Sequence, residues 1–266
     1  AKGEVQLQAN KVLQNKELTA GAFSFTATEV KDAAGNAIEP KAGESVWSNT
    51  KSNDVNGKVT FDTINYTLAD VGTHYYKITE ASGGTAGVTY DAKTVIVAVN
   101  VTDNGNGTLK VEKNVISGTD TTFTNIYNAV GHVDLTAHKT LTGRTMTAGE
   151  FSFTATAVDG DGTVLTGNKA WSDTKENDAS GNVSFNRIEY TTADIGVHYY
   201  KVTELIPKDA VDGSRYGVKY TTATVTYKVT VKDDVKDGNL EITREIVGDS
   251  TANTAEFTNE YSAKGE

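Results

Sequence analysis

Residues 47–80 read WSNTKSNDVNGKVTFDTINYTLADVGTHYYKITE, and residues 171–204 read WSDTKENDASGNVSFNRIEYTTADIGVHYYKVTE. Aligned without gaps, 21 of the 34 positions are identical, which chance does not produce. An internal repeat is sought before anything else because it determines how the chain divides into structural units. The chain therefore contains two copies of one unit.

The repeat extends to both ends of each copy. The further pairs are VQLQANKVL (5–13) with VDLTAHKTL (133–141), GAFSFTAT (21–28) with GEFSFTAT (149–156), and TTFTNIY (121–127) with AEFTNEY (255–261). This predicts two domains, 1–128 and 129–266, joined near residues 128–132, as a length of 266 residues also suggests. The second copy ends in AKGE, with which the chain begins. We expect from this that a further unit follows, the alternative being a shared expression scar.

The secondary structure of each copy is predicted to be β. Apolar and polar residues alternate in segments that recur every 8 to 15 residues, with turn signals such as Asn56-Gly57 and Asp237-Gly238-Asn239 between them. In the first copy these segments are 5–13, 23–30, 58–66, 74–80, 94–101, 108–116 and 121–127. No segment keeps the 3.6-residue period of a helix. The predicted fold class is all-β, with two tandem immunoglobulin-like, Greek-key β-sandwich domains.

Composition excludes several function classes. The net charge is −10 and both copies are acidic, which argues against binding to nucleic acid or to anionic lipid. There is no cysteine, so disulfides, thiolate metal sites and cysteine nucleophiles are excluded. No apolar run is long enough to span a membrane, and no signal peptide opens the sequence. We expect no metal and no cofactor.

Three polar residues per copy occupy positions where apolar residues are expected. Side chains alternate between the two faces of a strand, so residues two apart share a face. Lys11 then faces the core with Leu7 and Ala9, Glu80 with Tyr76 and Ile78, and Asn125 with Phe123 and Tyr127. The second copy has Lys139, Glu204 and Asn259 in the same registers. Each domain is therefore predicted to direct one lysine, one glutamate and one asparagine inward.

The residues alone allow three interpretations of these inward groups. The first is a buried Lys–Glu salt bridge with a hydrogen bond to the asparagine, since buried charges are normally paired. The second is a strand whose faces are misassigned by one residue. The third is covalent: in an apolar pocket the lysine and the glutamate exchange a proton, and the neutral lysine becomes a nucleophile.

The covalent interpretation requires each group to have a role. The lysine amine attacks the side-chain amide carbon of the asparagine, and a protonated glutamate hydrogen-bonds the asparagine carbonyl and passes protons to the departing ammonia. The product is an amide that joins the two side chains. Holding the groups in contact gives effective molarities of about 10⁵–10⁸ M, enough for a poor electrophile to react.

These elements resemble a known family. The YYK-hydrophobic-TE segment, a lysine in the first strand and FTN in the last strand are similar to the isopeptide domains of streptococcal backbone pilins and, more broadly, to collagen-adhesin B-type domains. The resemblance implies a Lys11–Asn125 bond assisted by Glu80, and a Lys139–Asn259 bond assisted by Glu204. It implies pilus shafts or adhesin stalks on the Gram-positive cell wall. No LPxTG-like signal or YPK-like pilin motif is present, which favours tandem domains in one long chain over sortase polymerisation.

Three function classes follow. The first is an extracellular structural stalk whose partners are neighbouring repeats of the same chain, with host ligands bound through another domain. The second is an adhesin whose own domains recognise a host protein or glycan. The third, a hydrolase, is disfavoured because no second inward acid accompanies Glu80, so we expect no enzymatic activity beyond a single self-directed turnover.

Other conspicuous residues are predicted to be structural. Asp159–Thr163 resembles the start of a calcium loop but has Val164 and Ala170 where that loop needs Gly and Glu, so a hairpin turn is favoured, as it is for Asp103–Thr108. We expect hydrogen bonds rather than metal for His74 and His198, packing rather than glycan binding for Trp47 and Trp171, and turn stabilisation for Asp70 and Asp194.

Overall fold

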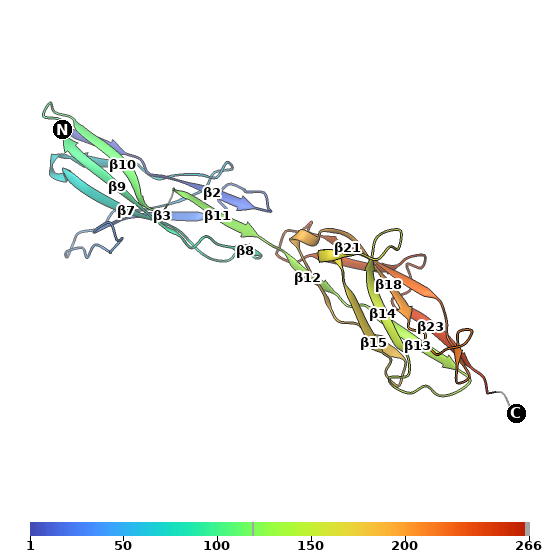
Figure 1. The fold of residues 1–266 in the computed structure, drawn as a ribbon. Helices are drawn as coiled ribbons and strands as arrows, with labels where there is room; N and C mark the ends of the chain where they lie inside the picture. The colour runs from blue at the N-terminus through green and yellow to red at the C-terminus, as the bar shows by residue number, and fades with distance from the viewer. Residues whose placement is uncertain (119, 264–266) are drawn as a thin grey trace. The chain divides into compact units, whose positions relative to one another are not determined.

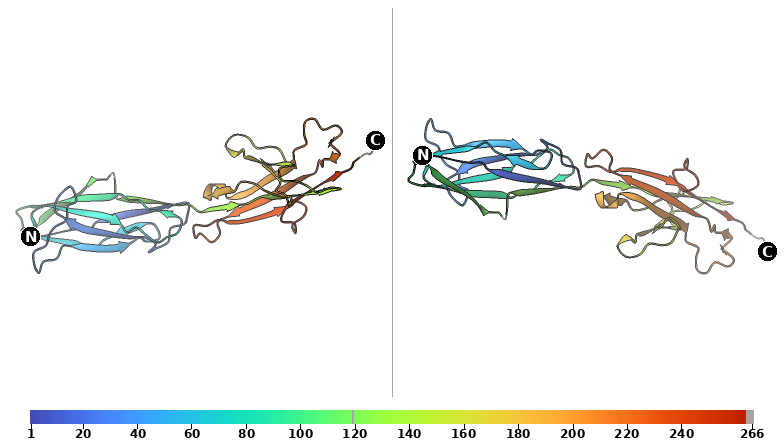
Figure 2. Two further views of the ribbon diagram at one scale, coloured as in Figure 1. Left: turned by 90° about the horizontal axis from the view of Figure 1, so that it is seen from below. Right: turned by 90° about the horizontal axis from the view of Figure 1, so that it is seen from above.

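The computed structural model describes residues 1–118 and 120–263, and the chain divides into two compact units, Ala1–Asn128 and Ala129–Glu266. Figures 1 and 2 show that each unit draws its strands from its own part of the sequence. The predicted fold class, two tandem β-sandwiches, is confirmed. Three of the four residues of the closing AKGE, on which the expectation of a following unit rests, lie outside the described residues. No helix in the described ranges is both long and apolar enough to cross a membrane.

Unit 1 packs a five-stranded sheet, in the order β10-β9-β7-β3-β4, against a four-stranded sheet, in the order β5-β2-β11-β8. Its elements are β1 (Lys2–Val5), β2 (Gln8–Gln14), β3 (Ser24–Val30), β4 (Ser48–Ser52), β5 (Lys58–Thr60), β6 (Ile64–Thr67), the 3₁₀ turn η1 (Leu68–Asp70), β7 (Gly72–Glu80), β8 (Val88–Thr89), β9 (Thr94–Asp103), β10 (Leu109–Ser117) and β11 (Thr122–Tyr127). The apolar faces of the two sheets form one core, which includes Ala9, Phe25, Ile78, Val99 and Phe123.

Unit 2 repeats this arrangement with sheets in the orders β15-β14-β18-β21-β22 and β16-β13-β23-β20-β19. Its elements are β12 (Val130–Val133), β13 (Thr136–Thr142), β14 (Ser152–Val158), η2 (Gly167–Lys169), β15 (Ser172–Glu176), β16 (Asn182–Ser184), β17 (Ile188–Thr191), η3 (Thr192–Asp194), β18 (Gly196–Glu204), β19 (Ser214–Arg215), β20 (Val218–Lys219), β21 (Thr224–Lys232), β22 (Glu241–Ile246) and β23 (Ala255–Tyr261).

Two predicted strands are each divided in the structure. Segment 5–13 becomes β1 and β2, and segment 58–66 becomes β5 and β6, because β1 pairs with β6 while β2 pairs with β5. The same division in unit 2 makes β12 out of Val130–Val133, which pairs with β17. The units divide between residues 128 and 129, inside the predicted junction of residues 128–132, and residues 130–132 of that junction form part of a strand.

Gly3 in β1 and Gly131 in β12 allow these two short strands to lie close to β10 and β22, respectively. A Cβ atom on Gly3 would lie 2.7 Å from Val111 Cγ2, and one on Gly131 would lie 2.7 Å from Ile242 Cδ1. Both distances are shorter than real carbon contacts permit. The residue type at these two positions is therefore set by close approach, not by backbone conformation.

Candidate functional site

The first and last main strands of unit 1, β2 and β11, are parallel neighbours in the same sheet. Their register pairs Lys11 with Phe123 and Leu13 with Asn125. Phe123 lies opposite Lys11, and Asn125, two residues further along β11, points to the same face as Phe123. Asn125 is therefore close to Lys11 on the core side of the sheet. Lys11 is 2% exposed and Asn125 is 0% exposed. Both polar side chains are therefore buried side by side.

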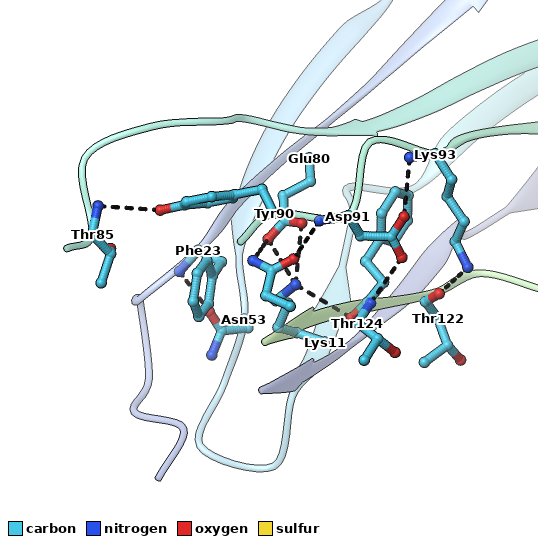
Figure 3. A network of polar contacts seen from close by, with 12 residues as sticks. Lys11, Phe23, Asn53, Glu80, Thr85, Tyr90, Asp91, Lys93, Thr122 and Thr124 are labelled. Carbon is cyan, nitrogen blue, oxygen red and sulfur yellow. Dashed lines mark hydrogen bonds and ion pairs between the residues drawn. The ribbon is translucent and has the colours of Figure 1, made fainter. Parts of the chain in front are cut away.

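Glu80 reaches the same point from β7 in the facing sheet. Its Oε1 lies 2.9 Å from Lys11 Nζ, and its Oε2 accepts a hydrogen bond from the same nitrogen at 3.1 Å. Asn125 Nδ2 donates to Oε1 at 2.9 Å. The Lys11 and Glu80 side chains are 0% and 1% exposed. One buried carboxyl group thus contacts both the amine and the amide nitrogen (Figure 3).

The side-chain carbonyl of Asn125 has a different partner. The backbone N–H of Asp91, in the loop after β8, donates to Asn125 Oδ1 at 2.8 Å. The expectation that the glutamate hydrogen-bonds this carbonyl is therefore wrong: Glu80 is bound to the nitrogen end of the amide. Sequence reasoning missed the Asp91 donor because a backbone N–H is present at nearly every residue and carries no residue-type signal.

Unit 2 repeats the constellation. Lys139 Nζ lies 2.9 Å from Glu204 Oε2, and Asn259 Nδ2 donates to Glu204 Oε1 at 2.8 Å. The backbone N–H of Thr221 donates to Asn259 Oδ1 at 2.8 Å. Lys139 and Asn259 are each 1% exposed. The register is also conserved between the units, since β13 and β23 are parallel and pair Lys139 with Phe257 and Leu141 with Asn259.

Aromatic rings enclose the lysine in each unit. Lys11 Nζ lies 4.7 Å from the centre of the Phe23 ring, and Lys139 Nζ lies at the same distance from Phe151. Burial in this apolar environment lowers the pKa of both lysines, although the hydrogen bond and charge of the partner glutamate act against it. Burial likewise raises the pKa of Glu80 and of Glu204. Both shifts favour the neutral forms of the pair.

A family model for FctA, described as a Spy0128-like isopeptide-containing domain, matches residues 7–128 and 135–262. The chain belongs to this family. The two matches cover both units and nearly the whole chain, with one FctA domain in each.

Solved structures similar to this pair of FctA domains include the major pilin T-13 of Streptococcus pyogenes, which is 20% identical, with 98% of this chain and 99% of that chain covered and a TM-score of 0.32. The C-terminal fragment of the pilus adhesin SpaC from Lactobacillus rhamnosus GG is 15% identical, with 98% and 100% covered and a TM-score of 0.32. A streptococcal ancillary pilin is 18% identical, with 98% and 63% covered and a TM-score of 0.26. No curated protein matches the chain.

The histidines and aspartates of the YYK segment are structural in both FctA domains. His74 Nδ1 lies 3.0 Å from Glu29 Oε1, and His74 Nε2 lies 2.8 Å from the carbonyl oxygen of Asp70. Asp70 caps η1 by accepting from the backbone N–H of Thr67 at 2.7 Å. His198 and Asp194 repeat the second and third contacts. The predictions of hydrogen-bonded histidines and turn-stabilising aspartates are confirmed.

The loop that resembles a calcium site is a hairpin turn. Asp159 Oδ1 accepts from the backbone N–H groups of Asp161 and Thr163 at 3.0 and 2.9 Å, and Val158 pairs with Val164 across the turn. The carboxylate is therefore engaged by the turn itself. Across the described part of the chain, no group of three or more His, Cys, Asp or Glu side chains could hold a metal ion.

The tryptophans pack in the same way in both domains. Trp47 contacts Tyr76 edge-on with ring centres 5.4 Å apart, and Trp171 contacts Tyr200 at the same distance. The packing prediction is confirmed. In unit 2 a cavity of about 630 Å³ adjoins Trp171 and Ala157. Ala157 occupies the position that Glu29 holds in unit 1.

Proposed function

We propose that this chain is a load-bearing segment of the shaft of a pilus, or of the stalk of an adhesin, on a Gram-positive cell surface, and that each domain closes itself with a Lys–Asn isopeptide bond. The observation that carries the proposal is the buried contact of lysine, glutamate and asparagine, repeated in both units with matching distances. Membership of an isopeptide-containing domain family supports it. Neighbouring repeats of the same chain are the expected partners.

The chemistry balances within each site. The proton of the Lys11 ammonium moves to Glu80, and the neutral amine attacks the side-chain amide carbon of Asn125. Glu80 takes a proton from the attacking nitrogen and gives one to Nδ2, which it already contacts. The bond from Nζ to the amide carbon forms, the bond from that carbon to Nδ2 breaks, and ammonia leaves. Glu80 is protonated when the amine attacks, and it is protonated again when ammonia has left.

Such a site is not an enzyme in the usual sense. Its product is an amide held in the core of its own domain, so the reaction occurs once per unit. The same argument applies to Lys139, Glu204 and Asn259 in unit 2. What the chain gains is a covalent link between its first and last main strands, where tension enters and leaves a domain of a tandem array.

The proposal predicts an intact mass below the sequence mass by two molecules of ammonia, one for each unit. Lys11→Ala is expected to restore the mass of one ammonia, and Lys11→Ala combined with Lys139→Ala that of both. Glu80→Ala is expected to restore one while Lys11 and Asn125 are still present, because only the proton carrier is removed. Intact-protein mass spectrometry measures the number of ammonia molecules lost, and mass-spectrometric sequencing of a digest identifies the linked peptides. An unmodified protein at its full sequence mass would contradict the covalent proposal and leave a buried ion pair.

The rate of bond formation, plotted against pH, is expected to be highest over an intermediate range and to fall on both sides of it. The reactive pair shares one proton, so the rate falls in acid when both groups are protonated, and in alkali when both have lost their protons. Because burial raises the pKa of Glu80, the acid limb begins at a higher pH than for an ordinary glutamate. Because burial lowers the pKa of Lys11, the alkaline limb begins at a lower pH than for an ordinary lysine.

This profile can be measured on unlinked chain recovered from inclusion bodies, or from a short in-vitro translation stopped in acidic guanidinium. Dilution into buffers of different pH starts folding, which tryptophan fluorescence follows, and acid-quenched samples give the linked fraction by mass. A rate that rises steadily into alkali, as for a free amine, would show that Glu80 has no proton to give.

A further inference from the structure

The carbonyl oxygen of the reacting asparagine is bound by a backbone N–H in both units. The donor is Asp91 in unit 1 and Thr221 in unit 2, and the N–H to Oδ1 distance is 2.8 Å in each. This oxygen is the atom on which negative charge develops when a nucleophile attacks the amide carbon. Asn125 and Asn259 are almost completely buried, so the developing charge cannot be stabilised by a hydrogen bond from bulk water.

The two donor positions make the same backbone contact but carry different side chains. Asp91 holds its loop with a carboxylate that accepts from the backbone N–H of Lys93 at 3.0 Å and of Thr124 at 2.9 Å. Thr221 holds its loop with a hydroxyl that accepts from the backbone N–H of Ala223 at 3.1 Å. The side chain is an acid in unit 1 and a neutral hydroxyl in unit 2, yet in both units the backbone N–H at this position donates to Oδ1 of the reacting asparagine.

The residue before each donor fixes the loop against the site. Tyr90 packs edge-on against Phe23 with ring centres 5.7 Å apart, and Tyr220 packs against Phe151 at 5.8 Å. These phenylalanines are the rings that lie beside the lysine amines. The donor is therefore held in place before any charge develops, which is the condition under which a hydrogen bond stabilises a transition state most.

We propose that the backbone N–H groups of Asp91 and Thr221 are the oxyanion donors of the two isopeptide-forming sites. The inference rests on the proposed function and assigns the two ends of the reacting amide to different groups. Glu80 and Glu204 serve the nitrogen end of the amide, as proton carriers, and the backbone N–H serves the oxygen end. In unit 2 the Thr221 N–H also hydrogen-bonds Glu204. The side chain at the donor position supports the loop. In unit 1 the Asp91 charge also acts to raise the pKa of Lys11 and the pKa of Glu80.

The test replaces the donor atom alone. In-vitro translation with a suppressor tRNA carrying the α-hydroxy acid analogue of threonine puts an ester in place of the amide at position 221, so that an oxygen replaces the N–H. Removing one oxyanion donor slows catalysis by about 10²–10³-fold in known enzymes. We expect unit 2 of the ester chain to link more slowly than threonine-loaded control chain by that factor, while unit 1 links at its normal rate in the same molecule.

Each outcome bears on one part of the argument. Linking of the ester-containing unit at the control rate overturns the inference and leaves the proposed function intact. Failure of the control chain to link in either unit overturns the proposed function itself. In a Trp47→Phe background, Trp171 fluorescence reports whether unit 2 has folded. If the ester prevents folding, the same replacement at position 91 decides the question in unit 1.

A side-chain exchange provides the matched control. Asp91→Thr gives unit 1 the donor residue of unit 2 and keeps the N–H, so we expect unit 1 to link within a few-fold of its normal rate. A loss as large as that of the ester would show that the Asp91 carboxylate, not the backbone N–H, acts in the reaction, and would overturn the inference.

Discussion

Pulled by its two ends, the unmodified chain is expected to show no full-length unfolding step in either unit. The bond of unit 1 spans 114 residue steps (125 minus 11), which would otherwise be released as roughly 380–410 Å of extended chain. Because β2 and β11 are parallel neighbours, opposite pulls on the start of one and the end of the other load the linked pair in shear. A covalent bond across that pair carries the load past the rest of the sandwich.

The chain outside the linked region is longer than the sequence pattern indicates. β1 precedes Lys11, and β12 lies in the 13 residues between Asn125 and Lys139 (residues 126–138). Only these paired ribbons remain free to detach from β6 and β17. Short extensions of the unmodified chain are therefore expected before it becomes inextensible.

Single-molecule pulling with matched variants tests this expectation. Glu80→Ala should restore one full-length step, from unit 1 alone, and Glu204→Ala should restore one from unit 2 alone. Each variant keeps the other unit as an internal standard. Two full-length steps in the unmodified protein would exclude the load-bearing mechanism, because ion pairs without a bond yield under sustained force.

Loss of the bond is also expected to reduce stability by an amount that depends on which partner is removed. Asn125→Ala breaks the cross-link and keeps the buried pair of Lys11 and Glu80. A cross-link that encloses a loop of this size contributes about 4–5 kcal/mol to the free energy of unfolding in the chain-entropy estimate. Lys11→Ala also removes the cross-link, and it removes the partner that Glu80 keeps in Asn125→Ala; breaking a buried pair in this way costs about 3–5 kcal/mol. We therefore expect Lys11→Ala to be the more damaging change.

Each unit contains one tryptophan, so the two effects can be measured separately. In a Trp171→Phe background, Trp47 fluorescence reports the denaturant unfolding of unit 1 alone. The free energy should fall from the unmodified protein to Asn125→Ala and again to Lys11→Ala. The double variant Lys11→Met, Glu80→Gln removes both charges and should lie near Asn125→Ala. Equal stability of Asn125→Ala and the unmodified protein would show that no bond spans the two strands.

Much of the site follows from the sequence because alternation along a strand is local. The period of two places Lys11 with Ala9, and Asn125 with Phe123, on buried faces, and these residues are buried in the structure. The duplication then applies the same registers to Lys139, Glu204 and Asn259. Local alternation and the duplication are therefore enough to predict the fold class, the two units and the six inward polar residues. Their roles in forming a bond remain a proposal.

Which of these groups meet, and through which atoms, depends on contacts between strands that are distant in the chain. β2 and β11 are parallel neighbours in one sheet although more than a hundred residues separate them in the chain, and the facing sheet packs against them. The same packing turns Glu80 to the nitrogen end of the Asn125 amide. It brings the Asp91 N–H to the oxygen end. Strand alternation specifies a face but not a partner, and a backbone donor leaves no mark in the sequence, so both had to come from the fold.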